Sequence, residues 1–245
     1  IGRGNMTMFY TAKDESGASA GFDLDLENVM VEKLIGLYPA IDTLVPMLRS
    51  FEGVVDCQIT ATCKMDSVMS LDLPSLNSAC YLHGENMVLL DGETFTEISK
   101  TLMFKNKKRN VIDSISVDLA IKDNKIEVFP FLVEMDRYKV AVGGTHNLDM
   151  TFNYHLSVLK SPVPFKLGID ITGNLDDFKY KIVKCRYKDL FKPAKEAELD
   201  STRTNVRKEI RESIRKQIKE TAPELVSSLS PNHTVTPPEG ETNAL

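Results

Sequence analysis

A two-residue alternation of apolar and polar side chains runs through most of Val111–Tyr187. Within Leu148–Val158 the apolar positions are Leu148, Met150, Phe152, Tyr154, Leu156 and Val158, and polar residues lie between them. Because successive side chains of a strand point to opposite faces, each such segment predicts a strand with one apolar and one polar face. Several of these strands joined by short turns predict an antiparallel meander.

The first half of the chain also predicts strands, which are interrupted by short helices. Apolar and polar residues alternate through Ala20–Glu27 and Phe51–Met65, and a further strand is expected at Met6–Lys13. Apolar residues at helical spacing predict short covering helices near 29–49 and 94–104. Both halves of the chain therefore contribute strands to the predicted sheet.

Turn signals divide the alternating stretches. Gly84–Asn86 predicts a turn that ends a strand at Leu76–His83, and Gly143–Gly144 predicts another. Asp123–Asn124 predicts a tight hairpin turn. Pro130 has no N–H to donate to a neighbouring strand, so it predicts an edge or a bulge at its position.

The residues after Tyr187 have a different character. Lys192–Ala222 is rich in charge and predicts an amphipathic helix whose thin apolar stripe consists of Leu199, Val206, Ile210, Ile214 and Ile218. The stripe is too narrow for a core helix, so one face is expected to dock on the sheet edge, on a membrane surface or on a partner helix. The chain thus divides into a β domain at 1–190, a helix at 191–222 and a tail at 223–245 that is expected to be disordered.

These patterns predict a mainly β fold with a few helices. A long antiparallel meander is expected to form a curved, groove-like or partly closed sheet beside the C-terminal helix. Eight strands of about ten residues present on the order of 1,200 Å² of apolar face, and the short helices cover on the order of 450 Å² of it. Soluble monomers rarely expose apolar patches above roughly a few hundred Å². The remainder is expected to be covered by the sheet itself, by another protein or by lipid chains.

Composition narrows the classes of partner. The formal net charge of the 245 residues is −5 and Trp is absent, so the chain has no general basic field with which to bind nucleic acid. No apolar run reaches the roughly 18 residues that a membrane-spanning helix needs. The chain begins at Ile1 without a signal peptide, which favours the interpretation that it is a fragment of a longer polypeptide.

No catalytic motif is present, and residues with catalytic chemistry are scattered. Cys57, Cys63, Cys80 and Cys185 match no zinc spacing and are expected to be buried free thiols. His155 lies between Asn153 and Ser157 on a polar face, and an enzyme that uses this group is one functional hypothesis. No third orienting group lies nearby in sequence, so a solvated strand face is expected instead. Asp23 and Asp25 are expected at the surface, and no cofactor or metal site is predicted.

Four short stretches stand out between Phe51 and Tyr187. They are G-E-N-x-x-L-L-D-G-E at Gly84–Glu93, E-V-F-P-F at Glu127–Phe131, N-L-D-x-x-F-x-Y-H at Asn147–His155 and S-V-L-K-S-P-V-P at Ser157–Pro164. Together they resemble the C-terminal region of the AsmA-like family in its Bacteroidetes branch. These stretches describe the family and contain no catalytic motif.

The resemblance implies a non-enzymatic periplasmic protein of the Gram-negative envelope, attached to the inner membrane by an N-terminal helix that this chain lacks. Such a protein would shield or conduct phospholipid between membranes and support outer-membrane assembly. Its partners would be phospholipid acyl chains and envelope or outer-membrane assembly proteins. The alternative is a structural scaffold for outer-membrane biogenesis that carries no lipid.

The apolar face supplies the candidate lipid-contacting residues. They are Phe22, Leu24, Ile59, Leu119, Phe152, Tyr154, Leu156 and Ile169. An ordinary core position is the alternative interpretation for each of them. A face whose side chains interlock from end to end would favour the scaffold, and an open trough would favour the lipid carrier.

Overall fold

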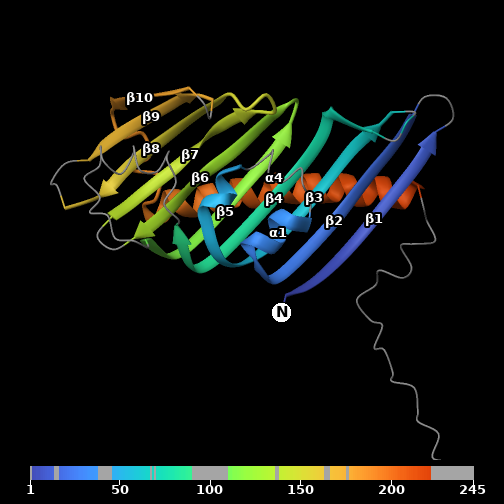
Figure 1. Cartoon of the computed structure of the whole chain (residues 1–245), viewed down its shortest axis with the longest axis horizontal. Helices are drawn as coiled ribbons and strands as arrows, with labels where there is room; N and C mark the ends of the chain where they lie inside the picture. Colours follow the sequence, from blue (N-terminus) through green and yellow to red (C-terminus); the bar gives the residue numbers. More distant parts are fainter. Residues whose placement is uncertain are drawn as a thin grey trace, which may run out of the picture.

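The computed structural model describes residues 2–13, 17–37, 46–66, 68, 70–89, 110–135, 138–162, 166–174 and 177–221. These residues form one ten-stranded antiparallel sheet in which each strand pairs with the next one along the chain (Figure 1). The strands are β1 (Arg3–Lys13), β2 (Gly17–Met30), β3 (Phe51–Met65), β4 (Leu71–Leu89), β5 (Asn110–Lys122), β6 (Lys125–Met135), β7 (Tyr138–Asn147), β8 (Phe152–Lys160), β9 (Leu167–Gly173) and β10 (Phe178–Val183). With β1 and β10 at opposite ends of the order, the sheet is an open meander, which confirms the predicted fold class.

Helices lie on both faces of the sheet. The short helix α1 (Val31–Leu37) and the 3-10 helix η1 (Pro46–Ser50) follow β2, within the region predicted to contain covering helices. The long helix α4 (Pro193–Thr221) crosses the opposite face, behind the strands in Figure 1. The helix predicted at 94–104 and the tail predicted at 223–245 lie outside the described residues.

The local signals for a hairpin and a bulge are confirmed. Asp123 and Asn124 have φ angles of +52° and +61°, the geometry of the tight turn that joins twisted strands, and they connect β5 to β6. The register between β6 and β7 shifts between Val128 and Phe131, at the place where Pro130 cannot donate a hydrogen bond.

Two predicted turns are wrong, because the residues lie inside strands. β4 continues through Gly84–Asn86 to Leu89, and Asn86 absorbs the irregularity with a φ of +51°. Gly143–Gly144 lies within β7, where a Cβ on Gly143 would be 2.9 Å from the Pro130 Cα. Glycine serves close packing at this position and does not reverse the chain.

The actual turn between β7 and β8 lies in residues that were predicted to begin a strand. Met150 has a φ of +69°, and its N–H donates to the Asn147 carbonyl at 3.0 Å. Asp149 accepts a hydrogen bond from the Thr151 N–H at 2.9 Å. β8 therefore begins at Phe152, four positions after the predicted start at Leu148.

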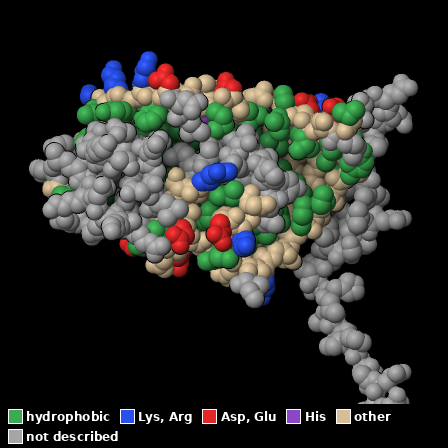
Figure 2. All heavy atoms as spheres, in the orientation of Figure 1, with side chains coloured by type: hydrophobic (Ala, Val, Ile, Leu, Met, Phe, Trp, Pro, Cys, Tyr) green, Lys and Arg blue, Asp and Glu red, His purple; other side chains and the backbone are tan. Residues whose placement is uncertain are grey.

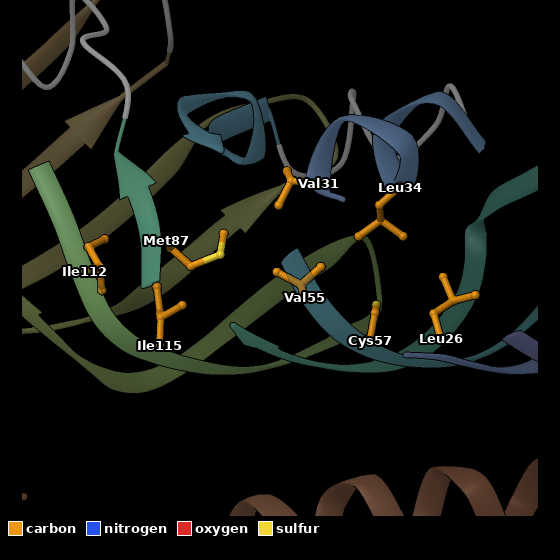
Figure 3. Packing of buried hydrophobic residues seen from close by; sticks show 8 residues of the cluster. All are labelled: Leu26, Val31, Leu34, Val55, Cys57, Met87, Ile112 and Ile115. Atoms are coloured by element: carbon orange, nitrogen blue, oxygen red, sulfur yellow. The ribbon is translucent and has the colours of Figure 1, made fainter. Parts of the chain in front are cut away.

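The largest core cluster lies between the sheet and α1. Figure 3 shows Val31 and Leu34 of α1 above Val55 and Cys57 of β3, with α4 on the other side of the sheet. Leu26, Met87, Ile112 and Ile115 complete the buried cluster. Fully burying an aliphatic side chain contributes about 1.5–3 kcal/mol, so these few contacts are enough to hold a helix as short as α1 on the sheet.

Candidate functional site

One row of directly opposed residues crosses the apolar face from edge to edge. From β1 to β10 it consists of Met6, Leu24, Ile59, Cys80, Leu119, Val128, Gly144, Tyr154, Ile171 and Tyr180. Residues opposite one another in neighbouring strands project to the same side of a sheet. Apart from Gly144, every member of this row has an apolar or aromatic side chain, so the apolar face spans all ten strands.

All of the residues predicted to contact acyl chains lie on this face. Leu24, Ile59, Leu119 and Tyr154 belong to the row, Phe22 lies two positions from Leu24, Phe152 and Leu156 flank Tyr154, and Ile169 pairs with Leu156. The period-two pattern of the sequence thus assigned these side chains to the correct common face. Their contact with lipid stays a prediction.

The residues predicted to contact lipid differ in how deeply they are buried. Ile169 is only 1% exposed and packs in a cluster with Val140, Val158 and Ile171, so it is a core residue in this conformation. The other predicted residues are half-buried. They combine packing within the sheet with a remaining accessible surface.

The apolar face is exposed at both edges of the sheet. Met8 on β1 is 61% exposed and Ile182 on β10 is 62% exposed, and the register places both on this face. Met6 and Tyr10 on β1 and Tyr180 on β10 are also exposed. Figure 2 views the sheet from the side of α1 and shows hydrophobic side chains at the surface near both of its ends. Apolar surface at an open edge of a sheet is a site where another apolar molecule can bind.

The polar face binds α4 through charge. Arg211 donates to Asp23 and Asp25 at 3.0 Å each, and its Nε donates to Thr60 at 3.2 Å. Asp23 and Asp25 are therefore partners of a helix 186 or more residues away, which corrects their interpretation as simple surface residues. The alternation within β2 predicted that Asp23 and Asp25 lie on the polar face, but it could not predict that Arg211 of α4 binds them there.

The apolar stripe of α4 also contacts this face. Ile214 is 2% exposed and forms a cluster with Phe9 and Ile210. Arg207 lies 4.6 Å from the centre of the Tyr81 ring, a cation–π contact. The sequence suggested the sheet edge, a membrane surface or a partner helix as the docking surface, whereas the helix packs on the polar face of its own sheet.

His155, Ser157 and Asp170 form a hydrogen-bonded chain on the same polar face. His155 Nδ1 lies 2.6 Å from Asp170 Oδ1, and His155 Nε2 lies 2.9 Å from Ser157 Oγ. The backbone N–H of Arg186 donates to His155 Nε2 at 3.2 Å, and that of Tyr187 donates to Ser157 Oγ at 3.0 Å. With Nε2 as acceptor, the Nδ1 proton is the one shared with Asp170.

This order of groups is that of a serine hydrolase triad, but the nucleophile is inaccessible. Ser157 is 0% exposed, and the Tyr187 ring packs edge-on against the His155 ring at 5.0 Å between centroids. The prediction of a solvated strand face is therefore wrong. In this conformation the cluster holds the segment after β10 against the sheet.

Asp170 is the group that orients His155. It was missed because it lies 15 residues from His155 in the sequence. Asp170 lies directly opposite His155 across β8 and β9, so the pairing register is the signal that would have identified it. Gly168 allows the close approach, because a Cβ there would lie 2.5 Å from the Lys184 carbonyl oxygen and 2.7 Å from His155 Cε1.

The four cysteines are free thiols, as expected; Cys57 and Cys63 are buried, whereas Cys80 and Cys185 are partly exposed, contrary to the expectation that all four are buried. Among the described residues, no helix has both the length and the apolar character needed to cross a membrane. Within the same ranges, no group of three or more His, Cys, Asp or Glu residues is arranged to hold a metal ion. Neither a family model, nor a curated protein, nor a solved structure matches this chain.

Proposed function

We propose that this chain is a non-enzymatic lipid-shielding module, whose apolar face lies against phospholipid acyl chains while α4 stiffens the opposite face. In this proposal it is the periplasmic part of an inner-membrane-anchored AsmA-like protein that supports outer-membrane assembly. The observation that supports it best is the apolar row that runs from β1 to β10 on an open sheet.

The asymmetry of the sheet supports a ligand on one face only. Arg211 and Ile214 of α4 occupy the polar face with matched charge and apolar contacts. On the apolar face, the covering helices that the structure describes, α1 and η1, pack on the cluster around Val55. Beyond that cluster, Phe152 and Tyr154 of β8 are half-buried: Phe152 packs against the cluster around Ile169 and Tyr154 against the cluster around Ile126, and each keeps some accessible surface. Acyl chains are a natural cover, because their burial against such residues removes apolar surface from water.

The exposed edges give lipid two entry points to the apolar face. A lipid that entered over Met8 of β1 or over Ile182 of β10 would meet an apolar side chain at every strand it crossed, except at Gly144. Continuous apolar contact avoids the cost of exposing the acyl chains to water at intermediate positions.

Site-specific photo-crosslinking tests the proposal. A benzophenone amino acid placed at Phe152 replaces one aromatic side chain on the apolar face by another. The matched control places it at the adjacent Asn153, an exposed position on the polar face of the same strand. A third variant carries the probe at Ile182, on the exposed edge. The variants are irradiated in cells, purified and analysed by mass spectrometry for phospholipid adducts.

Adducts at Phe152 and Ile182, with none at Asn153, are the expected result. Equal adduct yields at Phe152 and Asn153 would indicate contact with a membrane surface in general and would contradict a lipid-binding face. Absence of adducts from Phe152 and Ile182 alike would also contradict the proposal.

The scaffold function is supported by a different observation. Val158 and Ile169 are 2% and 1% exposed, so part of the apolar face in β8 and β9 is closely packed. A scaffold would use the exposed edge strands to bind an assembly protein. It predicts protein crosslinks at Ile182 and no lipid adducts at Phe152, so the same experiment separates the two functions.

A further inference from the structure

The β10 edge of the sheet carries a concentration of positive charge. The segment Phe178–Lys192 contains six Lys or Arg residues and one Asp, a formal charge of +5 in a chain whose total is −5, so the rest of the chain carries −10. In Figure 2, Lys and Arg side chains project from the corner of the molecule where Figure 1 places β10. This edge therefore has a charge opposite to that of the rest of the chain, and it is the part of the molecule that an anionic surface attracts.

Four of these cations, called the unpaired lysines below, are exposed and have no acidic partner among the described residues. The two remaining cations of the segment are paired, Arg186 with Asp170 and Lys192 with Asp189. The unpaired lysines are Lys179 and Lys181 of β10 and Lys184 and Lys188 in the segment that follows it.

The positive charges also lie close together in space. A hydrogen bond from Lys192, and the charges of Lys188 and Lys166, lower the pKa of Asp189. Lys166 immediately precedes β9, so a second strand contributes to the same positive field. The backbone of Lys184 also lies against β9, because a Cβ on Gly168 would be 2.5 Å from the Lys184 carbonyl oxygen. Ammonium groups gathered in this way repel one another, and an anionic partner relieves that repulsion.

The same strand carries exposed apolar side chains on its other side. Tyr180 is 51% exposed and Ile182 is 62% exposed, and they lie opposite Ile171 and Ile169 of the apolar face. Side chains alternate along a strand, so β10 presents lysines on one side and Tyr180 and Ile182 on the other. Within the described residues β10 is the last strand of the sheet, so a broad surface that meets this edge contacts both sides. The partner that fits has negative charges at its surface and apolar groups just beneath them.

We propose that the β10 edge docks on a membrane surface that contains anionic phospholipids, with the unpaired lysines on the headgroup phosphates and with Tyr180 and Ile182 at the boundary of the acyl chains. Lysine side chains reach headgroups from beside an apolar contact, and tyrosine suits a boundary that is apolar on one side and wet on the other. A nucleic acid or an acidic protein would bind the lysines but has no apolar layer for Ile182. This inference goes beyond the shielding of lipid, because it does not require acyl chains along the apolar row.

Flotation of the whole chain with vesicles tests the proposal. Vesicles of phosphatidylglycerol and phosphatidylcholine in equal parts should bind the chain, and vesicles of phosphatidylcholine alone should bind it far more weakly. Each lysine near an anionic surface contributes about a fivefold factor, so Lys179→Gln with Lys181→Gln should weaken binding about thirtyfold. The matched control is Lys122→Gln with Lys125→Gln, the same loss of charge at exposed positions of the β5–β6 hairpin, and it should leave binding unchanged. Ile182→Asn should weaken binding without changing the charge.

Binding that requires phosphatidylglycerol and is weakened by the β10 variants but not by the hairpin control supports the proposal. Equal binding to both kinds of vesicle, or equal losses in the β10 and hairpin lysine variants, would overturn it. A single-stranded oligonucleotide that binds as tightly as the anionic vesicles, together with an Ile182→Asn variant that binds normally, would assign the lysines to polyanions in general and would also overturn it. Lipid adducts at Phe152 in a chain that binds no vesicles would overturn this inference alone, and vesicle binding without those adducts would contradict the lipid-shielding function alone.

Discussion

Replacing Arg211 by Met should loosen α4 from the sheet. The guanidinium Nη2 lies 3.0 Å from an oxygen of Asp23 and 3.0 Å from an oxygen of Asp25. The side chains of Arg211 and Asp23 are 21% and 15% exposed, so water screens this pair only partly, whereas Asp25 is 43% exposed. Removing one member of a buried pair costs about 3–5 kcal/mol, and exposed pairs contribute less than about 1 kcal/mol. We therefore expect Arg211→Met to lower the free energy of unfolding by about 3 kcal/mol, with most of the loss arising from the Asp23 pair.

Urea denaturation followed by circular dichroism measures this loss. The double variant Arg211→Met with Asp23→Asn should recover part of it, because the single variant leaves the Asp23 carboxylate without the guanidinium of Arg211, and the cycle should give a coupling of about 1–3 kcal/mol. Lys208→Met on the same helix is the control, since Lys208 is exposed and pairs only with Glu212 among the described residues. A loss below about 0.5 kcal/mol for Arg211→Met, equal to that of the control, would refute the inference that charge fixes α4 to this face.

Three further predictions concern other parts of the molecule. Ser157→Ala should cost about 1–3 kcal/mol in urea denaturation, because the partly buried Tyr187 N–H loses its acceptor, and an unchanged midpoint would contradict the role of the cluster. Burial raises the pKa of Asp118 above its usual 3.8, so the stability that this group contributes is complete below 3.8 and is lost as the pH rises through the folded-state value. Thermal melts should therefore show Asp118→Asn gaining on the native chain as the pH rises above 3.8, and a pH-independent difference would refute this. A hydrogen bond with Cys57 and desolvation raise the pKa of the Cys80 thiol, so iodoacetamide should modify this half-buried thiol more slowly in the folded chain than after unfolding, and peptide mapping that finds equal rates would contradict this.

The alternation of side chains predicted the architecture because the sheet is a simple meander. Each strand pairs with its neighbour in the chain, so knowing the faces of consecutive strands is enough to assemble the apolar row. The strand Phe51–Met65 was predicted with its observed bounds, and its apolar residues Val55, Cys57 and Ile59 lie on one face. The same reasoning placed the residues predicted to contact lipid on one common face of the sheet.

The two turn predictions were wrong because the same residue types suit both turns and irregular or closely packed strands. Asn86 and Gly143 are residue types that favour turns, but in this sheet they accommodate an irregular strand and a close contact with Pro130. Contacts between distant segments were also missed. The pairing of Arg211 with Asp23 joins residues 188 positions apart, and no periodicity within either segment identifies the other.

The candidate sites were predictable to different degrees. The apolar face follows from local pattern, whereas the buried His155 cluster depends on the register that brings Asp170 opposite it. The position of α4 depends on where the helix crosses the sheet, and the helical stripe of Ile210 and Ile214 defines a docking face without defining that position. The sequence pattern thus predicted which face of each strand or helix is apolar. It did not predict which of these faces pack together in the folded chain.

Native mass spectrometry of the chain, purified from a Gram-negative host without detergent, tests whether the apolar face binds phospholipid. We expect a population with bound phospholipid. In the same account, a charge placed on the apolar face by Leu156→Glu removes the lipid, and Asn153→Glu on the polar face of the same strand leaves it bound. A folded chain that carries no lipid, or a lipid-bound population that neither substitution alters, would contradict it.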